Sequence, residues 1–334
     1  MKIDIHTHIM PPDLPDFSAR FGYDGYISLQ HQPDGSVWMW QNGQRFRQVQ
    51  PNCFDAETRL RECAEHGVEL QVLSTIPVLF NYWAPAEHAL VVSRCLNDHI
   101  ADVVRQWPQH FIGLGTLPLQ SPELAISELE RCVRELGLAG VEIGTHVQGL
   151  NLDDPGLFRV LEAAQDLGAA VFVHPWDMRG SETIQKYWLP WLLAMPFETA
   201  VAMASLILGG VLEKLPRLRI AFAHGGGSFG CLMGRIEHGF HVRPDLCNLH
   251  NLSSPRDYLD RVYVDSLVHE LPALQELLRV YGPEHVCLGS DYPFPLGEAV
   301  PGSLIERADL SPALRQRLLA GNALDWLGLS GQGT

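Results

Sequence analysis

The stretch MKIDIHTH, residues 1–8, decides more about the fold than any other part of the chain. It opens directly as a β-strand and does not have the form of a signal peptide. His6 and His8 are two residues apart, so a strand directs both imidazoles to one face, while Ile3 and Ile5 are expected to face surrounding helices. An H-x-H pair alone indicates a metal site only weakly, because polar residues often end a strand.

Seven further short apolar runs follow from about residue 68, and longer helical patterns separate them. The predicted strands are residues 70–75, 111–116, 140–144, 169–174, 219–224, 262–265 and 286–289. Helix starts such as Ser121-Pro122 and Asp154-Pro155 combine a capping residue with proline. Strands alternating with helices form βαβ units and a parallel sheet. Together with the first strand, eight such units predict an α/β fold, a closed (β/α)8 TIM barrel.

One segment, at about residues 15–50, interrupts this alternation. It carries Asp34-Gly35 and Asn42-Gly43 between alternating runs, which strongly indicates hairpins. We predict a small antiparallel β-meander of three strands, inserted over the barrel mouth after the first strand. Arg45 and Arg47 are then expected on one face, since strand side chains alternate. The whole chain, residues 1–334, is predicted to be a single barrel domain with this insertion.

Composition narrows the possible partners. The net charge is −15, from 24 Lys and Arg against 39 Asp and Glu, which argues against nucleic-acid binding because phosphates require a basic surface. An anionic substrate must therefore be held by a few local basic groups. No apolar run approaches the roughly 20 residues of a membrane span. Seven scattered cysteines without a C-x-x-C pair are typical of reduced thiols, so we expect a cytoplasmic protein.

Metal-binding residue types recur at the ends of the predicted strands. His174, His224 and Asp291 each close an apolar run, as His6 and His8 do. The carboxyl ends of barrel strands carry the active site, so these side chains are expected to meet. Three histidines and one aspartate offer the nitrogen and oxygen ligands that zinc accepts, with water in the remaining position. Iron and manganese accept the same ligands and stay open as alternatives.

Longer motifs indicate a family. They are GLGTLP at 113–118, VHPWDM at 173–178, WLPW at 188–191, HGGG at 224–227 and SDYPFPLGE at 290–298. With the histidine pair of the first strand, they resemble the amidohydrolase superfamily and, within it, a branch of non-oxidative decarboxylases. The resemblance runs from residue 1 to about residue 324.

The resemblance implies a particular metal centre. One zinc ion per subunit would be held by His6, His8, His174 and Asp291, and His224 would orient or deprotonate water on the metal. Asp291 would also shuttle a proton. The strand-four position that bridges two metals in some relatives is implied to be empty here. Glu142 is the only candidate near it, and we expect Glu142 to face the helices, which favours a single metal.

The resemblance also implies a substrate. It is an aminocarboxymuconate semialdehyde, a dicarboxylate of tryptophan breakdown through kynurenine, whose decarboxylation limits quinolinate formation. Arg47 would bind a substrate carboxylate, and Arg235 would reach the neighbouring subunit's site in a homodimer. The resemblance places Trp191, Met178 and Phe294 at the substrate. From the residues alone, a single arginine is more often a solvated charge, and a tryptophan is as often core.

Other functions remain in competition. The same metal site suits a hydrolase of lactones or amides, because one barrel supports either chemistry. Gly226-Gly227-Ser228-Phe229-Gly230 matches the G-x-S-x-G of serine hydrolases. However, it overlaps the HGGG motif, and the two motifs lie on separate loops in that class of enzyme. The glycines are therefore interpreted as letting the backbone pass close to substrate or metal. His146 and His269 follow predicted strands and are left without a role.

Overall fold

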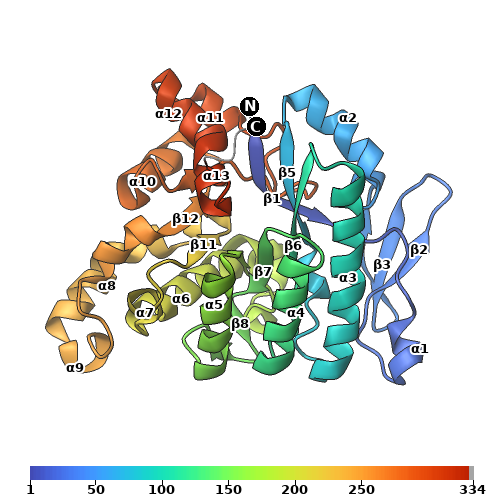
Figure 1. The fold of residues 1–334 in the computed structure, drawn as a ribbon, viewed down its shortest axis with the longest axis horizontal. Coiled ribbons are helices and arrows are strands. Elements are labelled where there is room, and N and C mark those ends of the chain that lie inside the picture. Colours follow the sequence, from blue (N-terminus) through green and yellow to red (C-terminus); the bar gives the residue numbers. More distant parts are fainter. Residues whose placement is uncertain (331–334) are drawn as a thin grey trace.

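The computed structural model describes residues 1–330, and its centre is a parallel sheet of eight strands (Figure 1). The strands follow the order of the chain around the sheet: β1 (Ile3–Ile9), β5 (Leu70–Thr75), β6 (Phe111–Gly115), β7 (Gly140–Gly144), β10 (Ala170–His174), β11 (Arg219–Phe222), β12 (Val262–Asp265) and β13 (Val286–Cys287). The predicted strands are confirmed to within two residues at each end. The carboxyl ends of all eight strands lie at one mouth, because parallel strands share a direction.

The sheet closes on itself between its last and first strands. Ile5 N–H donates to Leu288 O over 2.9 Å, and His8 N–H donates to Tyr292 O over 2.8 Å. The segment after β13 therefore runs alongside β1 and completes the ring. This confirms the prediction of a (β/α)8 barrel.

Helices surround the barrel in the intervals between strands. The α-helices within residues 1–330 are α1 (Phe17–Phe21), α2 (Ala56–His66), α3 (Ala86–Gln106), α4 (Pro122–Arg134), α5 (Pro155–Leu167), α6 (Met195–Leu208), α7 (Val211–Lys214), α8 (Phe229–Val242), α9 (Pro244–Cys247), α10 (Leu271–Tyr281), α11 (Ser303–Arg307), α12 (Pro312–Gln316) and α13 (Asn322–Leu327). The predicted caps are present: the Ser121 side chain accepts from Leu124 N–H, and Asp154 accepts from Gly156 N–H. Proline follows each cap, where its missing N–H does no harm.

The face taken by the first isoleucines differs from the prediction. Ile3 and Ile5 pack in one cluster with Val72 and Phe172, inside the barrel. The cause is a β-bulge in β1, where the pairing with β5 shifts its register between Asp4 and Thr7. A bulge places two consecutive residues opposite one, so the side-chain alternation changes phase. Residues before and after the bulge therefore share the inner face.

The insertion forms a three-stranded antiparallel sheet from β2 (Ser28–His31), β3 (Val37–Gln41) and β4 (Gln44–Val49). Figure 1 shows it at one side of the barrel, beside α3. The prediction of three strands is confirmed, but the prediction that Arg45 and Arg47 share one face of the sheet is wrong. Arg47 pairs with Met39 and Arg45 with Trp40, with a register shift between them. Arg45 therefore stacks on Trp38, 4.9 Å from its ring centre, while Arg47 turns to the opposite face.

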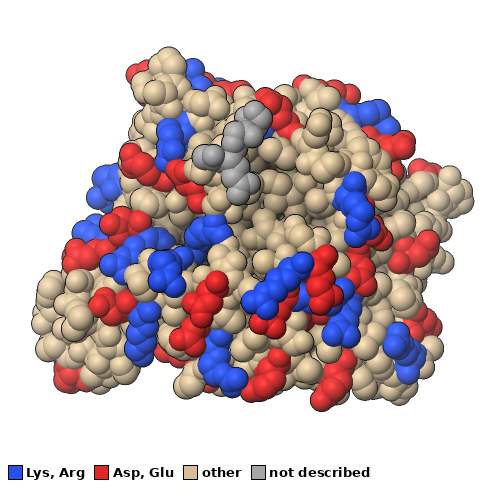
Figure 2. All heavy atoms as spheres, in the orientation of Figure 1, with Lys and Arg blue, Asp and Glu red and all other residues tan. Residues whose placement is uncertain are grey.

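Contrary to the expectation that no apolar run approaches the length of a membrane span, one segment, Lys186–Leu208, is long and apolar enough by length and composition alone. Half of its apolar window is buried, and Met203 and Leu206 in α6 are fully enclosed in the barrel's outer core. A helix packed in the core of a soluble protein meets the same criteria of length and composition. Figure 2 shows acidic and basic side chains interspersed over one face of the molecule.

Candidate metal centre and active site

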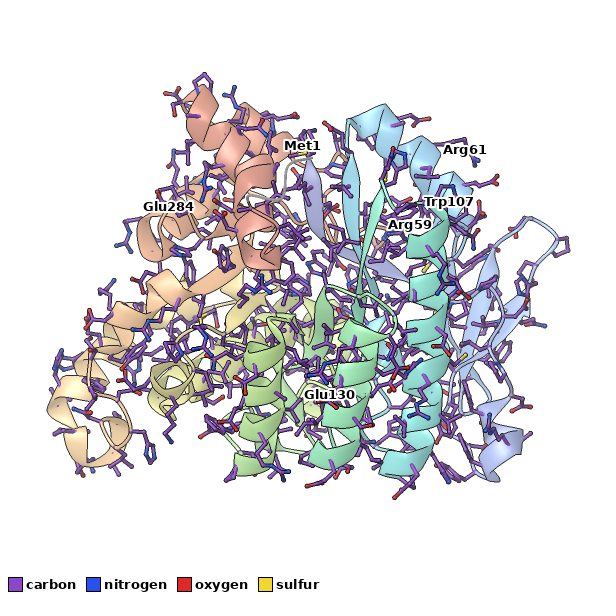
Figure 3. The ribbon with its side chains drawn as sticks, viewed as in Figure 1. Met1, Arg59, Arg61, Trp107, Glu130 and Glu284 are labelled. Atoms are coloured by element: carbon purple, nitrogen blue, oxygen red, sulfur yellow. The ribbon has the colours of Figure 1, made fainter. Side chains whose placement is uncertain are left out.

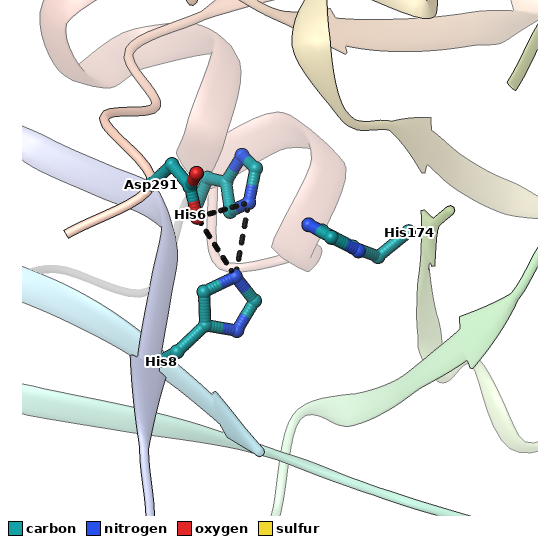
Figure 4. Close-up of side chains that lie close together, drawn as sticks. All are labelled: His6, His8, His174 and Asp291. Carbon is teal, nitrogen blue, oxygen red and sulfur yellow. Dashed lines mark hydrogen bonds and ion pairs between the residues drawn. The ribbon is translucent and has the colours of Figure 1, made fainter. Parts of the chain in front are cut away.

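Four side chains meet at the carboxyl end of the barrel: His6, His8, His174 and Asp291 (Figure 4). Nε2 of His6 lies 3.2 Å from Nε2 of His8 and 3.5 Å from Oδ1 of Asp291, and Nε2 of His8 lies 3.2 Å from the same oxygen. Ligand atoms about 2.0–2.2 Å from a tetrahedral zinc ion are separated by about 3.3–3.6 Å. The spacing of these atoms therefore fits a common metal ion.

The outer nitrogen of each histidine is already engaged. Nδ1 of His6 lies 2.7 Å from Asp265 Oδ2, that of His8 lies 2.9 Å from Thr75 O, and that of His174 lies 2.9 Å from Pro175 O. Because these partners are acceptors, each Nδ1 carries its proton and each Nε2 presents a lone pair. Nε2 of His174 is buried without a hydrogen-bond partner in the described chain, as expected of a ligand atom. The donor set therefore fits a divalent metal.

The electrostatics of His8, His174 and Asp291 favour the forms that bind metal. His6 differs: burial would lower its pKa, but the hydrogen bond to Asp265 and the charge of Asp291 raise it, so a metal ion competes with a proton at that ring. Burial lowers the pKa of His8 and holds that of His174 well below the ordinary 6.5, so both rings are neutral at pH 7. Burial would raise the pKa of Asp291, but the hydrogen bond from His8 and the nearby imidazoles outweigh it and the pKa falls. Neutral imidazoles and an ionised carboxylate are what a divalent cation requires.

Asp265, which the sequence reasoning missed, supports this cluster from below. It ends β12 and is fully buried. Its carboxylate accepts from the ring of His6, from His224 N–H over 2.9 Å and from Gly225 N–H over 2.8 Å. The signal was present in the sequence, because Asp265 closes a predicted strand as Asp291 does. The sequence does not show that the Asp265 carboxylate contacts His6 on β1 and the residues that follow β11.

His224 follows β11 and lies beside the cluster. Its ring centre is 5.0 Å from that of His174 and 5.2 Å from that of His6. Burial, with the nearby His6, lowers the pKa of His224 to about 4, so the ring is neutral and able to accept a proton at pH 7. Both His224 and Asp291 have positive φ angles, 57° each, a conformation found more often at functional sites than elsewhere.

The glycines after His224 allow a close approach. Gly227 has φ of 62°, and a Cβ there would lie 2.2 Å from Pro196 O. The close approach at Gly227 is therefore to the backbone of Pro196, and the expected approach to substrate or metal stays a prediction. Ser228 donates to Pro196 O over 3.4 Å, and within residues 1–330 it has no hydrogen bond with His224. A serine nucleophile activated by this histidine does not fit that geometry.

The prediction for Glu142 is wrong. Glu142 is fully buried, and it pairs in register with Phe172, whose ring lies 5.0 Å from that of His6 inside the barrel. Paired residues of neighbouring strands share a face, so Glu142 faces the interior too. Its Oε1 lies 3.6 Å from Nδ1 of His8, the nitrogen turned away from the cluster. Burial raises the pKa of Glu142 well above its usual range.

A cavity of about 280 Å³ opens above the cluster. Arg47, Trp191 and Phe294 line it, as do His8, His174, His224 and Asp291. The Arg47 guanidinium lies 4.7 Å from the ring centre of Phe294, and burial lowers its pKa while the charge of Asp291 opposes that shift. An arginine remains charged under these conditions, so the cavity presents a cation to an anionic ligand.

Two residues predicted to contact substrate, Met178 and Arg235, do not line the cavity of this chain, whereas His269, for which no role was predicted, does. Met178 does not line the cavity; it is buried in a cluster with Met195 and Trp191. Arg235 is exposed on α8, outside the cavity of its own chain. His269, which follows β12 with φ of 63°, lines the cavity rim. A histidine a few residues beyond a strand end gave too little signal to choose it in advance.

Known proteins are similar in sequence to this chain over almost its whole length. A 2-amino-3-carboxymuconate-6-semialdehyde decarboxylase from Dictyostelium discoideum is 51% identical over 330 residues, covering 98% of this chain and 92% of that protein. One of the same name from Caenorhabditis elegans is 37% identical over 377 residues, covering 98% and 94%.

Solved structures share the fold. A dihydroxybenzoic acid decarboxylase from Polaromonas sp. JS666, with bound manganese and the inhibitor 2-nitroresorcinol, has a TM-score of 0.78 at 24% identity and covers 98% and 97% of the two chains. The amidohydrolase family profile matches residues 3–329. With the barrel, the histidine pair on its first strand and relatives of this identity, the chain belongs to the amidohydrolase family.

Proposed function

We propose that this chain is a metal-dependent decarboxylase that converts 2-amino-3-carboxymuconate 6-semialdehyde to 2-aminomuconate 6-semialdehyde. This places it in tryptophan breakdown through kynurenine, where its action limits quinolinate formation. The observation that carries the proposal is the buried cluster of three histidines and Asp291, whose ligand atoms all lie within 4.8 Å of one another beside a cavity lined by Arg47. Relatives that carry this name at up to 51% identity support the substrate.

The chain's own residues account for each part of the reaction. Arg47 binds a substrate carboxylate by charge-assisted hydrogen bonds and orients the scissile bond. The carbon–carboxylate bond breaks, carbon dioxide leaves, and the electron pair remains on carbon until a proton arrives. His224, neutral at pH 7, takes a proton from water, and the ionised Asp291 carboxylate relays that proton to carbon. The hydroxide that remains takes a proton from solvent, so the reaction consumes one proton overall. A bound divalent metal supplies Lewis acidity and lowers the pKa of water.

We propose one zinc ion per subunit, held by His6, His8, His174 and Asp291. Imidazole nitrogen and carboxylate oxygen in this number are typical of catalytic zinc. Manganese accepts similar ligands. Elemental analysis of the protein purified without added metal, followed by reconstitution of the metal-free chain with zinc or manganese, identifies the ion that restores the rate.

We further propose a cytoplasmic homodimer of single-domain subunits in which Arg235 completes the neighbouring site. Arg235 is exposed on α8 and, within residues 1–330, forms no ion pair with an acidic side chain. Apolar side chains of the same helix and of α9 are also exposed, namely Leu232, Val242 and Leu246. A second copy that covers this surface would bury them and bring a second cation to a substrate with two carboxylates.

Trp191, Phe294 and Met178 are proposed to shape the substrate pocket, Met178 from behind Trp191.

The decisive experiment is an assay with the freshly generated semialdehyde, followed by release of carbon dioxide. We expect wild-type turnover and, for His224→Ala, a decrease in kcat of about 10²–10⁴, the usual contribution of a general base, with unchanged metal content. A His224→Ala protein that keeps its metal and most of its rate would contradict the assigned role. Acid release from a lactone panel without carbon dioxide release would instead establish a hydrolase.

A further inference from the structure

Arg59 in α2 is a buried cation that the proposed reaction does not use. Its side chain is 0% exposed. Figure 3 shows Arg59 set inward from Arg61, which lies at the outer edge of the molecule two residues along the same helix. The guanidinium donates to three oxygens: His8 O over 2.7 Å, Asn52 O over 3.0 Å and Gln71 Oε1 over 3.1 Å. One of these belongs to a proposed metal ligand.

The backbone of His8 is held on both sides. Its N–H donates to Tyr292 O over 2.8 Å, and its carbonyl accepts from Nη1 of Arg59. With the ring bonded to Thr75 O, neither the peptide units nor the imidazole of His8 is free to rotate. Arg59 is the only side chain in this set that reaches His8 from outside the barrel strands.

Arg59 also contacts the neighbour of the second ligand. Its guanidinium lies 4.7 Å from the ring centre of Tyr292, which directly follows Asp291. The Tyr292 hydroxyl donates to Glu62 Oε2 over 2.5 Å, and Asn52 donates to the same oxygen over 3.0 Å. Glu62 is one turn from Arg59 on α2. This helix therefore contacts Tyr292 twice: Arg59 lies over its ring, and Glu62 accepts the hydrogen bond of its hydroxyl.

This arrangement is poorly explained by stability alone. Within residues 1–330, Arg59 forms no ion pair with a carboxylate, and burying a charge costs several kcal/mol that neutral acceptors repay only in part. A methionine would fill similar space without that penalty. A second buried ionisable group lies on the same seam of the barrel: Asp4 accepts from His6 N–H over 3.2 Å and from Ser290 N–H over 3.0 Å. Each of the two groups thus ties a histidine of β1 to a residue adjacent to Asp291.

We propose that Arg59 is a positioning residue that sets the relative placement of His8 and Asp291, and thereby the affinity and coordination geometry of the metal. It touches neither metal nor substrate and acts through the His8 carbonyl and the Tyr292 ring. Outer contacts of this kind typically alter metal affinity or activity by about 10–100-fold. The inference rests on the metal site of the proposed function but not on its substrate.

The test compares Arg59→Met and Arg59→Lys with the control Arg61→Met, whose side chain is exposed on the same helix. The measurements are the zinc dissociation constant by chelator competition, the visible absorption of the cobalt-substituted protein, and kcat and KM at saturating metal. For Arg59→Met we expect zinc affinity about 10–100-fold weaker and an altered cobalt spectrum. We also expect a lower kcat with KM within about twofold. Arg59→Lys retains a charge and one donor direction and should lie between, while Arg61→Met matches wild type.

A folded Arg59→Met protein with the wild-type zinc constant and cobalt spectrum would overturn the inference, even if its melting temperature falls. Should Arg59→Met fail to fold, the same two measurements on Arg59→Lys decide, and wild-type values there overturn it equally. Zinc and cobalt binding involve no substrate. A wild-type chain that binds metal but does not decarboxylate the semialdehyde therefore refutes the substrate assignment and leaves this test intact.

Discussion

At the scale of single residues, Asp265 connects the proposed ligand His6 to the proposed base His224. One carboxylate oxygen accepts from the His6 ring and from His224 N–H, and the other accepts from Gly225 N–H and Leu267 N–H. All four partners are donors, so the ionised form satisfies every contact. Burial would raise the pKa of Asp265, but the hydrogen bond from His6, the charges of His6 and His224 and the hydrogen bond from Gly225 N–H together outweigh it, so the pKa falls and the group stays ionised.

Asp265→Asn should weaken metal binding with little change in shape. The amide NH₂ would face donors where an acceptor is needed, so Nδ1 of His6 would lose its partner and its fixed tautomer. We expect zinc affinity to fall by about 10–100-fold, measured by chelator competition. Asp166→Asn, a change at an exposed site, is the control. A wild-type zinc constant for Asp265→Asn would show that the tautomer is held by something else.

At the scale of elements, small irregularities in strands decide which side chains enter the site. The bulge in β1 allows Ile5 and His6 to share the inner face, so apolar barrel filling and metal ligands follow each other directly. The register shift between β3 and β4 has a comparable result. It sends Arg47 to the cavity and leaves Arg45 on the tryptophan-bearing face.

The two arginines of β4 therefore form a matched pair for mutation. Arg47→Ala removes a charge-assisted bond worth about 1.5–3 kcal/mol, so kcat/KM should fall by about 10–150-fold, mainly through KM. Arg45→Ala, at an exposed position, should stay within about twofold. Steady-state kinetics with the semialdehyde measure both. Equal losses in the two variants would mean that Arg47 acts through the small sheet and not through the substrate.

At the scale of the whole molecule, the proposed ligands come from distant parts of the ring. β1 supplies two, β10 supplies one, and the segment after β13 supplies the fourth. A metal bound by all of them links the first strand to the strand opposite and to the closing seam. Since such a site does not exist in the unfolded chain, metal binding adds to folding stability.

Metal removal should accordingly lower the melting temperature. At a free metal concentration of 100 times the dissociation constant, binding contributes about 2.7 kcal/mol, which corresponds to roughly 4 °C for a single domain of 334 residues. Protons compete for the imidazole nitrogens, so the stabilisation should be lost as pH falls through the ordinary histidine pKa of 6.5 and below. Calorimetry with and without chelator at pH 7.5 and pH 5.5 measures this. A melting temperature that does not respond to chelation at pH 7.5 would contradict a bound structural role for the metal.

The proposed dimer makes a separate prediction by complementation. Arg235→Ala and His224→Ala should each be inactive alone, because one lacks the neighbour's cation and the other the base. When the two proteins are mixed and allowed to exchange subunits, half of the dimers are mixed and each contains one intact site. About a quarter of wild-type activity should return. An inactive mixture, despite subunit exchange shown by differential labelling, would place Arg235 outside the neighbouring site.

The sequence by itself determined the barrel and placed five candidate site residues at strand ends, because strand periodicity and strand-end position are local properties. The choice of four of them as ligands, with His224 left as the base, is what the family resemblance implies. His6, His8, His174 and Asp291 each stand at the end of a recognisable apolar run, and parallel strands must bring such ends together. The tertiary structure alone decided the inward direction of Glu142, the separation of Arg45 from Arg47, and the roles open to Asp265 and Arg59. Those depend on strand register and on contacts between residues as far apart as Arg59 and Tyr292. A bulge that shifts register leaves no periodic trace in the chain, so only the assembled barrel reveals which buried charges support its metal site.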